Sequence, residues 1–499
     1  MATVNEVGAR APSQERLRQN ALRSRGVLAA YSVTNMAPAI ATLFVMGSIV
    51  AGAGIAAPLI VLWAGIAFLF HVNTSAEFSR VTPSSGSYVT FLGRSFGPIG
   101  GGMTGFAMSL AMPILGAAVI FQMGLWTQTA VAGLFHFNLA WWIPGLVLMV
   151  LAAALVIAGV VLSVRAALAL FSFELFVLLA GAIGMLVANS GSISGTGFNP
   201  ANIQGGAKGL GLAFPVAVFL FVGASAPNTL AEETHRPRRT LPWAMMAGTL
   251  FGTALYVLTS WSEGIGFKNN VVALLKAPYP FLAAAQHATP WLGDLVFIAG
   301  FTSALAVLVV ALNLACRVWF SMARDSLLPK PLTAIHPRLR TPWVAAASYT
   351  AIAIAICFVV DWISGPGNGF AYTASFATII YVLVYIGANT ALPFHYRREH
   401  RSEYSIWRHL VAPSVGTLLL LYPLWAIVKP TQPRPYNWFG LVVLALAAVA
   451  AIYSLALRRR GVAVGTVLAE DDGDGASLVG AVPVLNTQSA LRMQPPQGT

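Results

Sequence analysis

Long apolar runs constrain this chain more than any other feature of its sequence. A helix needs about 20 predominantly apolar residues to cross a lipid bilayer. Twelve runs approach or exceed that length, and they lie at 27–50, 56–79, 99–127, 141–163, 166–189, 210–231, 242–265, 292–322, 342–362, 370–393, 408–428 and 437–457. The sequence therefore predicts an all-α polytopic membrane protein with about 12 transmembrane helices.

Composition excludes the soluble alternatives. Charged residues make up 9% of the chain and hydrophobic residues 57%, whereas a soluble domain carries roughly 25% charged residues. The net charge of +13 can indicate nucleic acid, but the basic residues lie in short segments between apolar runs. That placement is typical of loops beside a membrane. We expect a lipid bilayer as the partner and no nucleic acid.

The distribution of basic residues predicts an orientation. When the twelve runs alternate in direction, most of the 29 Lys and Arg residues fall on the side of the N-terminus. Cytoplasmic loops carry the excess of Lys and Arg. We therefore expect a multi-pass protein of the cell membrane with both termini in the cytoplasm.

Two of the runs are interrupted. The first contains Asn35-Met36-Ala37-Pro38-Ala39, and the sixth contains the segment 223–228, Gly-Ala-Ser-Ala-Pro-Asn. They are corresponding members of two five-helix halves that run in opposite directions. An ordinary proline kink explains either break alone, but a matched pair points to the binding site of a transporter. The substrate-binding candidates are Asn35, Met36, Ala37, Pro38, Ala39, Gly223, Ala224, Ser225 and Asn228.

The breaks also predict the kind of substrate. The N-terminus of a half-helix attracts an anion and its C-terminus attracts a cation, so a pair of breaks suits a zwitterion. Neither break carries a charged side chain. We expect a substrate with a neutral side chain, in a pocket lined by Met36, Ala224 and Ser225 together with residues of the third and eighth runs.

Three motifs follow one another along the chain: AEFSRVTPSSGSY at 76–88, EETHRPRRTLP at 232–242 and ARDSLLP at 323–329, the last preceded by Asn313 and Arg317. They resemble the motifs of amino acid permeases in the amino acid–polyamine–organocation superfamily. The resemblance implies a leucine-transporter-like fold with a five-plus-five inverted repeat and two extra helices. It also implies alternating-access transport of an amino acid or a related small amine. The family often has an aromatic residue and an acid after the glycine of run six, whereas Ala224 and Ser225 follow Gly223 here.

The resemblance suggests a division of the chain. We expect a cytoplasmic N-terminal segment at 1–26 and a ten-helix transport core at 27–393. Two additional transmembrane helices follow at 394–460, and a disordered cytoplasmic tail at 461–499, which is rich in glycine and has an acidic patch.

Glu174 is the acidic residue that the sequence places near mid-membrane, about nine residues into its run. A charged acid there costs about 2.5–3.5 kcal/mol on insertion scales, so such residues are usually functional or paired. Glu174 is the first candidate for proton coupling and His71 the second. The alternatives are a neutral or paired glutamate that holds the bundle together, and a histidine that bonds between helices. The resemblance also disfavours sodium coupling, because relatives that use sodium have hydroxyl groups at about 304–311, at the centre of run eight, and this segment has none.

Four residues near the cytoplasmic ends of runs two and eight are candidates for a cytoplasmic gate: Glu77, Arg80, Asn313 and Arg317. We expect Arg317 and Asn313 to be braced against an acid such as Glu77. The sequence thus favours a secondary active transporter, proton-coupled, without metal or cofactor. An exchanger or a passive channel on the same fold remains the alternative. A membrane-embedded enzyme is less favoured, because the sequence has no HExxH motif and no cluster of intramembrane acids.

Overall fold

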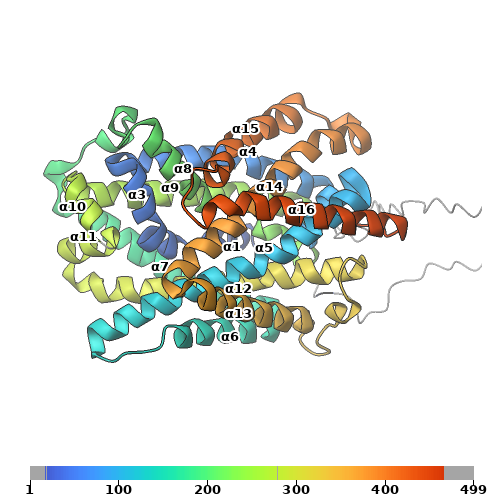
Figure 1. The fold of residues 1–499 in the computed structure, drawn as a ribbon, viewed down its shortest axis with the longest axis horizontal. Helices are drawn as coiled ribbons and strands as arrows, with labels where there is room; N and C mark the ends of the chain where they lie inside the picture. The colour runs from blue at the N-terminus through green and yellow to red at the C-terminus, as the bar shows by residue number, and fades with distance from the viewer. Residues whose placement is uncertain (1–16, 18–19, 278, 466–499) are drawn as a thin grey trace, which may run out of the picture.

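The computed structural model describes residues 17, 20–277 and 279–465, and within them it is built of helices (Figure 1). Nine described segments are long and apolar enough to cross a membrane, and the first of them, Arg25–Val81, turns back at Gly54 and makes two passes. Two shorter apolar helices, α6 and α8, bring the passes in the described chain to twelve, as the sequence predicts.

The passes follow one another along the chain with short connections. The first pass is α1 (Arg25–Asn35), α2 (Pro38–Ile40), η2 (Ala41–Val45) and α3 (Met46–Ala53), and the sixth is α8 (Ala207–Phe219) with η7 (Ala226–Glu233). The other ten are α4 (Ala57–Val81), α5 (Tyr88–Phe135), α6 (Trp142–Ala158), α7 (Val160–Ala188), α9 (Pro237–Gly266), α12 (Gly293–Arg324), α13 (Trp343–Ser364), α14 (Pro366–Glu399), α15 (Ala412–Val428) and α16 (Tyr436–Arg459).

Shorter elements connect these passes. They are η3 (Gly54–Ala56), η4 (Ser190–Ser192), η5 (Thr196–Phe198), η6 (Pro200–Asn202), α10 (Val271–Lys276), α11 (Pro280–Ala288), η8 (Pro290–Leu292), η9 (Lys330–Thr333), η10 (Arg401–Glu403) and η11 (Trp407–Val411). We call the side where α1 begins and α16 ends the N-terminal side. The helices α10 and α11 lie on the opposite side.

The first pass breaks because of its proline. Pro38 disfavours a helical conformation for the residue before it, and Ala37 accordingly adopts φ 52°, ψ 65°. A left-handed conformation costs a non-glycine residue roughly 1–2 kcal/mol. The chain then resumes as a continuous helical run over 38–53, so the break is confined to two residues.

The sixth pass breaks differently. Helix α8 ends at Phe219, a series of turns follows, and Gly223 adopts φ 99°. The chain does not return to an α-helix but continues as the 3₁₀ segment η7. A second departure from the expected runs is in α5, which begins at Tyr88 and bends at Gly97, just before Pro98.

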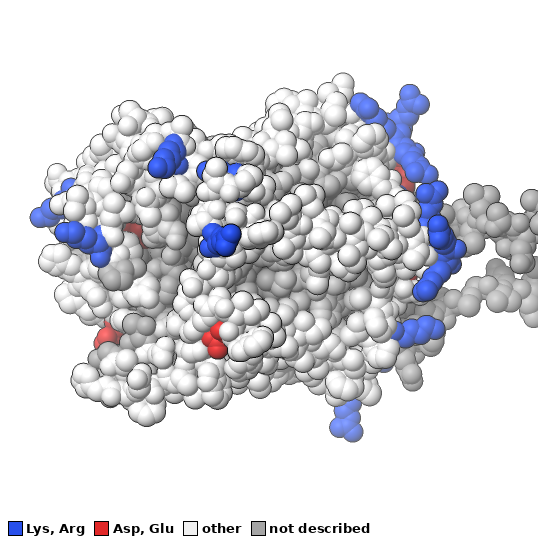
Figure 2. Space-filling view, viewed as in Figure 1, with Lys and Arg blue, Asp and Glu red and all other residues white. Residues whose placement is uncertain are grey.

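Helices of one half pack against helices of the other around the centre: α1 and α4 against α9, and α7 against α12. The two last passes lie outside this core, where α15 contacts α4 and α14, and α16 contacts α5. Figure 2 shows a broad uncharged surface between two ends that carry the charged side chains. Large apolar side chains of α13 and α16, such as Trp362 and Leu444, are exposed, as expected for residues that face lipid.

Candidate functional site

The two breaks lie side by side and are bonded to each other. The side-chain amide of Asn35 donates to the carbonyl of Gly223 over 3.0 Å. The hydroxyl of Ser32 donates to the carbonyl of Ala224 over 2.6 Å. The carbonyl of Gly223 also accepts from the backbone amide of Ala226 over 2.9 Å. The two side-chain bonds link the first break to the sixth, so the breaks form one unit.

Tyr256 of α9 joins the breaks from a third direction. Its hydroxyl lies 2.6 Å from the carbonyl oxygen of Met36 and 3.5 Å from that of Leu220. The first oxygen belongs to the break in the first pass and the second to the end of α8. One side chain therefore holds the end of each half-helix.

Gly223 occupies a position that other residues fit poorly. Its φ of 99° lies in the region that favours glycine. A Cβ atom at this position would collide with the side-chain amide of Asn35. A side chain here would push the two breaks apart.

A cavity opens beside the breaks. Asn35, Gly223 and Ser225 contribute to its wall from the two breaks. The polar part of the wall also includes Ser87, Tyr88, Thr229, Tyr349, Tyr381 and Tyr385, and the apolar part is Met108, Met112, Leu115, Val119, Val222, Val307, Ala311, Leu314 and Val318. Within the described chain no charged side chain lines it.

A chain of hydrogen bonds leads from this cavity into the bundle. The hydroxyl of Tyr88 donates to Ser225 over 2.8 Å, and it lies 3.0 Å from Nε2 of His71. Nδ1 of His71 lies 3.1 Å from the side-chain oxygen of Asn389. Both ring nitrogens of His71 are thus bonded, which is how a histidine that joins helices behaves.

Glu174 lies on the other side of the first break. Its side chain is fully buried, and its two carboxyl oxygens have no partner with hydrogen-bond geometry among the described residues. The hydroxyl of Ser303 and the backbone amide of Ala39 lie near it. The amide of Ile40 lies 3.4 Å from the same Ser303 hydroxyl. The carboxyl group therefore faces the start of the helical run 38–53, where an anion is favoured.

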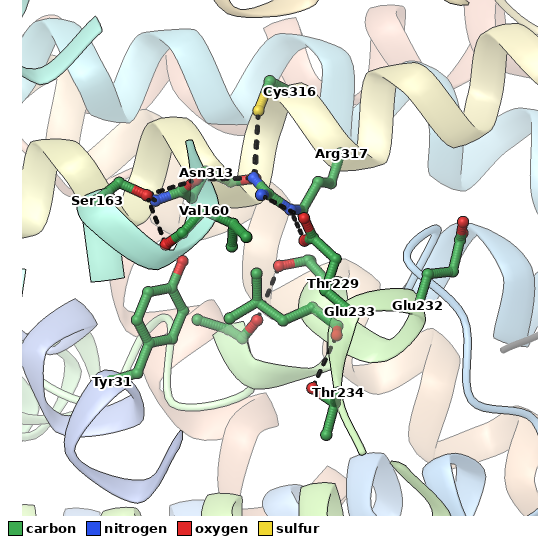
Figure 3. Close-up of polar contacts among 12 residues, drawn as sticks. Tyr31, Val160, Ser163, Thr229, Glu232, Glu233, Thr234, Asn313, Cys316 and Arg317 are labelled. Carbon is green, nitrogen blue, oxygen red and sulfur yellow. Dashed lines mark hydrogen bonds and ion pairs between the residues drawn. The ribbon is translucent and has the colours of Figure 1, made fainter. Parts of the chain in front are cut away.

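On the N-terminal side, a buried ion pair joins α12 to η7 (Figure 3). Arg317 Nε lies 2.5 Å from Glu233 Oε2, and both side chains are fully buried. Arg317 also donates to the side-chain oxygen of Asn313 over 2.7 Å, and Asn313 donates to Ser163 of α7 over 3.0 Å. The network holds three passes together.

Two more contacts strengthen this region. Arg324 and Glu232 form a second pair at 2.5 Å, which is partly exposed. The backbone amide of Leu22, just before α1, donates to the carbonyl of Glu233 over 3.0 Å, and the amide of His235 donates back to Leu22 over 2.9 Å. The segment that precedes α1 is therefore attached to the end of the sixth pass.

Farther from the N-terminal side, four aromatic rings pack together. The ring of Trp126 lies 4.8 Å from that of Phe44 and 4.9 Å from those of Tyr279 and Phe297. Trp126 follows the cavity residue Val119 by seven positions on α5, which is roughly 10 Å along a helix. The cluster joins the first, third and eighth passes with the segment before α11.

The sequence comparison decides the family. The model of the family described as "Amino acid permease" matches residues 31–458. This range includes both breaks and all twelve passes, apart from the start of the first pass and the last residue of the twelfth. The chain belongs to the amino acid permease family.

Relatives of this permease are transporters. It is 26% identical over 326 residues to the branched-chain amino acid permease BcaP of Bacillus subtilis, covering 60% of this chain and 66% of that protein. It is 24% identical over 352 residues to the serine/threonine exchanger SteT of Bacillus subtilis, covering 68% and 76%. It is 25% identical over 321 residues to the methylthioribose transporter of Bacillus subtilis, covering 60% and 67%. The match to BcaP thus spans slightly less than two thirds of that protein's length.

A solved structure supports the fold. A mutant of the Eremococcus coleocola manganese transporter matches with a TM-score of 0.54 at 13% identity, covering 92% of this chain and 97% of that one. At 13% identity, this similarity shows the fold and not the function. Together with the family match, it confirms the leucine-transporter-like arrangement that the sequence motifs implied.

The structure places some predicted site residues of the permease away from the cavity. Asn35, Gly223 and Ser225 line it, but Met36, Ala37, Pro38, Ala39, Ala224 and Asn228 do not. The side chain of Met36 packs against Gly252 of α9. Asn228 accepts a hydrogen bond from Ser79 over 2.5 Å. The prediction that Met36 and Ala224 line the pocket is wrong for this structure, because the backbone of each break turns those side chains into the bundle.

The predicted gate residues separate into two groups. Arg317 and Asn313 lie together as expected, but their acidic partner is Glu233 and not Glu77. The carboxylate of Glu77 lies 3.1 Å from His409 Nε2, 3.3 Å from Arg80 and 3.5 Å from Arg408. Glu77 therefore attaches the segment before α15 to α4. Sequence distance along a helix does not tell which acid on a neighbouring helix faces an arginine.

Several residues of the site were not singled out from the sequence. Tyr88 and Glu233 lie within the quoted motifs, but their partners come from other helices. Ser303 lies one residue before the segment 304–311 that lacks hydroxyls, and it contacts the first pass. Tyr256 has no motif around it. The sequence signal that could have identified Tyr256 is its position seven residues, or two helical turns, before the acid Glu263 in the same apolar run.

Proposed function

We propose that this permease is a secondary active transporter that moves an amino acid with a neutral, apolar side chain into the cell by alternating access. The observation that carries the proposal is the cavity, because both breaks border it and its described lining has no charged side chain. Pockets of this kind are mostly apolar, with a few polar groups that fix orientation. The named relatives are transporters, and none suggests a membrane-embedded enzyme.

The polar and apolar parts of the cavity suggest how a substrate lies in it. The two breaks, at 35–39 and 223–228, hold the amino and carboxylate groups through backbone atoms and through Asn35 and Ser225. The side chain of the substrate then points toward Met108, Met112 and Val307. Similarity to a protein named for branched-chain amino acids supports this substrate class.

The amino and carboxylate groups of the substrate would lie in a cavity whose described lining has no charged side chain. An arginine or lysine side chain would add a positive charge with no carboxylate in the lining to pair with it, and a buried unpaired charge is costly. Cationic amino acids and polyamines are therefore poor substrates in this proposal.

We propose Glu174 as the residue that carries the coupling proton, ahead of His71. A buried carboxyl group without a hydrogen-bond partner changes its interactions most when it gains or loses a proton. Among the described residues, Glu174 has no partner with full hydrogen-bond geometry, although the Ser303 hydroxyl and the Ala39 amide lie near it. Both ring nitrogens of His71 are bonded. Glu174 also lies beside the first break, so its charge acts on the segment that must move during transport.

The remaining parts of the proposal concern closure and orientation. The N-terminal side is the cytoplasmic side, since it carries most basic residues, and the protein lies in the cell membrane. The pair of Arg317 and Glu233, with Asn313, closes the cytoplasmic route. Glu77 and Arg80 hold the end of α4 during this movement, and the aromatic cluster around Trp126 closes the outer route.

Exchange is the second candidate function, favoured by the similarity to a serine/threonine exchanger. One experiment separates the two. Purified protein in liposomes is tested for uptake of labelled leucine with and without an inward proton gradient, and for counterflow against unlabelled leucine. The proposal expects accumulation only with the gradient, and competition by neutral amino acids but not by arginine, lysine or putrescine. Counterflow without gradient-driven accumulation would support the exchanger, and strong competition by arginine would contradict the neutral substrate.

A further inference from the structure

A second buried acid lies in the half of the bundle opposite the N-terminal side. Glu263 of α9 is fully buried, and neither of its carboxyl oxygens has a hydrogen-bond partner among the described residues. It is the seventh residue after Tyr256 on the same helix, so it lies roughly 10 Å farther along the helix axis. The transport function proposed above assigns it no role.

The helix register places Glu263 on a polar stripe. Residues four apart lie on one face of a helix, and Glu263 follows Thr259 by four positions. The hydroxyl of Thr259 lies 3.2 Å from that of Thr42, in the first pass. Tyr256 follows on the same side toward the break, where its hydroxyl contacts the carbonyl of Met36.

The stripe leads toward Glu174. Tyr256 lies close enough to Glu174 to interact with its charge. The helices α7 and α9 pack against each other, and Met185 of α7 lies against Gly266 of α9. Met185 and Glu174 are eleven residues apart, about three turns, and so share one face of α7. Glu263 and Glu174 therefore border the same helix interface at different depths.

Charged neighbours do not account for Glu263. Among the described residues, no charged group on α9 or on the elements that pack against it acts on the Glu263 carboxyl group. Burial is the one feature that sets this carboxyl group apart from a carboxyl group in water. Tyr256, on α9 itself, is a titratable neighbour of Glu174. An unpaired buried carboxyl group is costly and in a membrane usually marks an ion or proton pathway.

We propose that Glu263 is the proton acceptor on the outer side, which loads Glu174 through the stripe formed by Thr259, Thr42 and Tyr256. Water completes the path where the hydroxyl groups are too far apart for direct bonds. The route runs between α9, α7 and the first pass, whereas the substrate cavity lies against α5, α12 and α14. Proton and substrate thus reach the centre by separate paths.

This inference depends on the proposed role of Glu174, and it predicts a different defect. A carrier residue fixes how far accumulation proceeds, while a relay residue fixes only how fast the proton arrives. Glu263→Gln should lower the initial rate of gradient-driven leucine uptake in liposomes by about tenfold or more, yet reach the wild-type plateau. Counterflow should be unchanged, since it does not require proton release. Glu263→Asp should restore most of the rate.

The matched control is Asp294→Asn, which removes an exposed acid in the first turn of α12. It should leave rate and plateau unchanged. Counterflow at the wild-type rate shows that a Glu263→Gln protein is folded. A normal initial rate in Glu263→Gln would overturn the proposal, and so would a lost plateau, which would make Glu263 the carrier itself. Absence of gradient-driven uptake in the wild type would instead defeat the proposed coupling as a whole. If Glu263→Gln cannot be obtained folded, and Glu263→Asp folds but does not restore the wild-type initial rate, the residue serves stability and the relay is also overturned.

Discussion

The two breaks of this permease lie side by side, but they are built differently. The break in the first pass spans two residues, and its side chains turn into the bundle, with Glu174 facing the helix that resumes at Pro38. The break in the sixth pass is longer, contains Gly223, and directs Val222, Gly223 and Ser225 to the cavity. The difference suggests that both breaks hold the ionised groups of the substrate, through Asn35 and Ser225, and that only the first break also responds to the proton.

The largest expected effect comes from filling the sixth-pass break. Gly223→Leu should abolish substrate binding, because the side chain collides with Asn35 and the φ of 99° disfavours a branched residue. The measurement is binding of labelled leucine to purified protein. Gly365→Leu is the matched control, since Gly365 also has a positive φ, of 71°, but nothing lies where its Cβ would be. Normal binding by Gly223→Leu would remove the sixth-pass break from the site.

The anchor at the end of this break provides the second prediction. Glu233→Gln leaves the buried Arg317 without its counter-ion, and breaking a buried pair costs roughly 3–5 kcal/mol. We expect a clear fall in the thermal unfolding temperature in detergent. Glu232→Gln should have a smaller effect, since its pair with Arg324 is partly exposed. Equal falls in the two variants would contradict the special role given to the buried pair.

Much of this arrangement could be predicted from the sequence. The twelve passes and both breaks could be predicted, because bilayer thickness fixes the length of apolar runs and Pro38 and Gly223 interrupt a helix locally. The partner of Arg317 could not be predicted, because Glu77 and Glu233 both lie at suitable depths and only the packing of η7 against α12 separates them. The inward turn of Met36 depends on the conformation of Ala37, which no local pattern specifies.

The coupling residue gives the third prediction, which tests the first-pass half of the comparison. Glu174→Gln resembles the protonated carboxyl group and cannot release a proton. It should keep substrate exchange but lose accumulation driven by a proton gradient. The assay compares liposomes that are acidic outside and neutral inside with exchange without a gradient. Full accumulation in the variant would return Glu174 to a structural role and make His71 the next residue to test.

The smallest expected effect concerns the bridge between the breaks. Tyr256→Phe removes the hydroxyl that contacts Met36 and, more distantly, Leu220. A hydrogen bond of this kind contributes about 0.5–1.5 kcal/mol, so we expect leucine affinity to fall by roughly 2–10-fold. Isothermal titration of the purified protein measures this change. An unchanged affinity would show that the two breaks are held together without Tyr256.

The central claim, that both breaks bind substrate and only the first also responds to the proton, is tested most directly by leucine affinity as a function of pH. In a proton symporter, substrate and proton strengthen each other's binding, so the wild type should bind leucine more tightly as the pH falls. Glu174→Gln should bind tightly at every pH. Ser225→Ala, changed in the other break, should weaken binding by a similar factor at every pH and keep the slope. A pH dependence that survives in Glu174→Gln, or disappears in Ser225→Ala, would contradict the account.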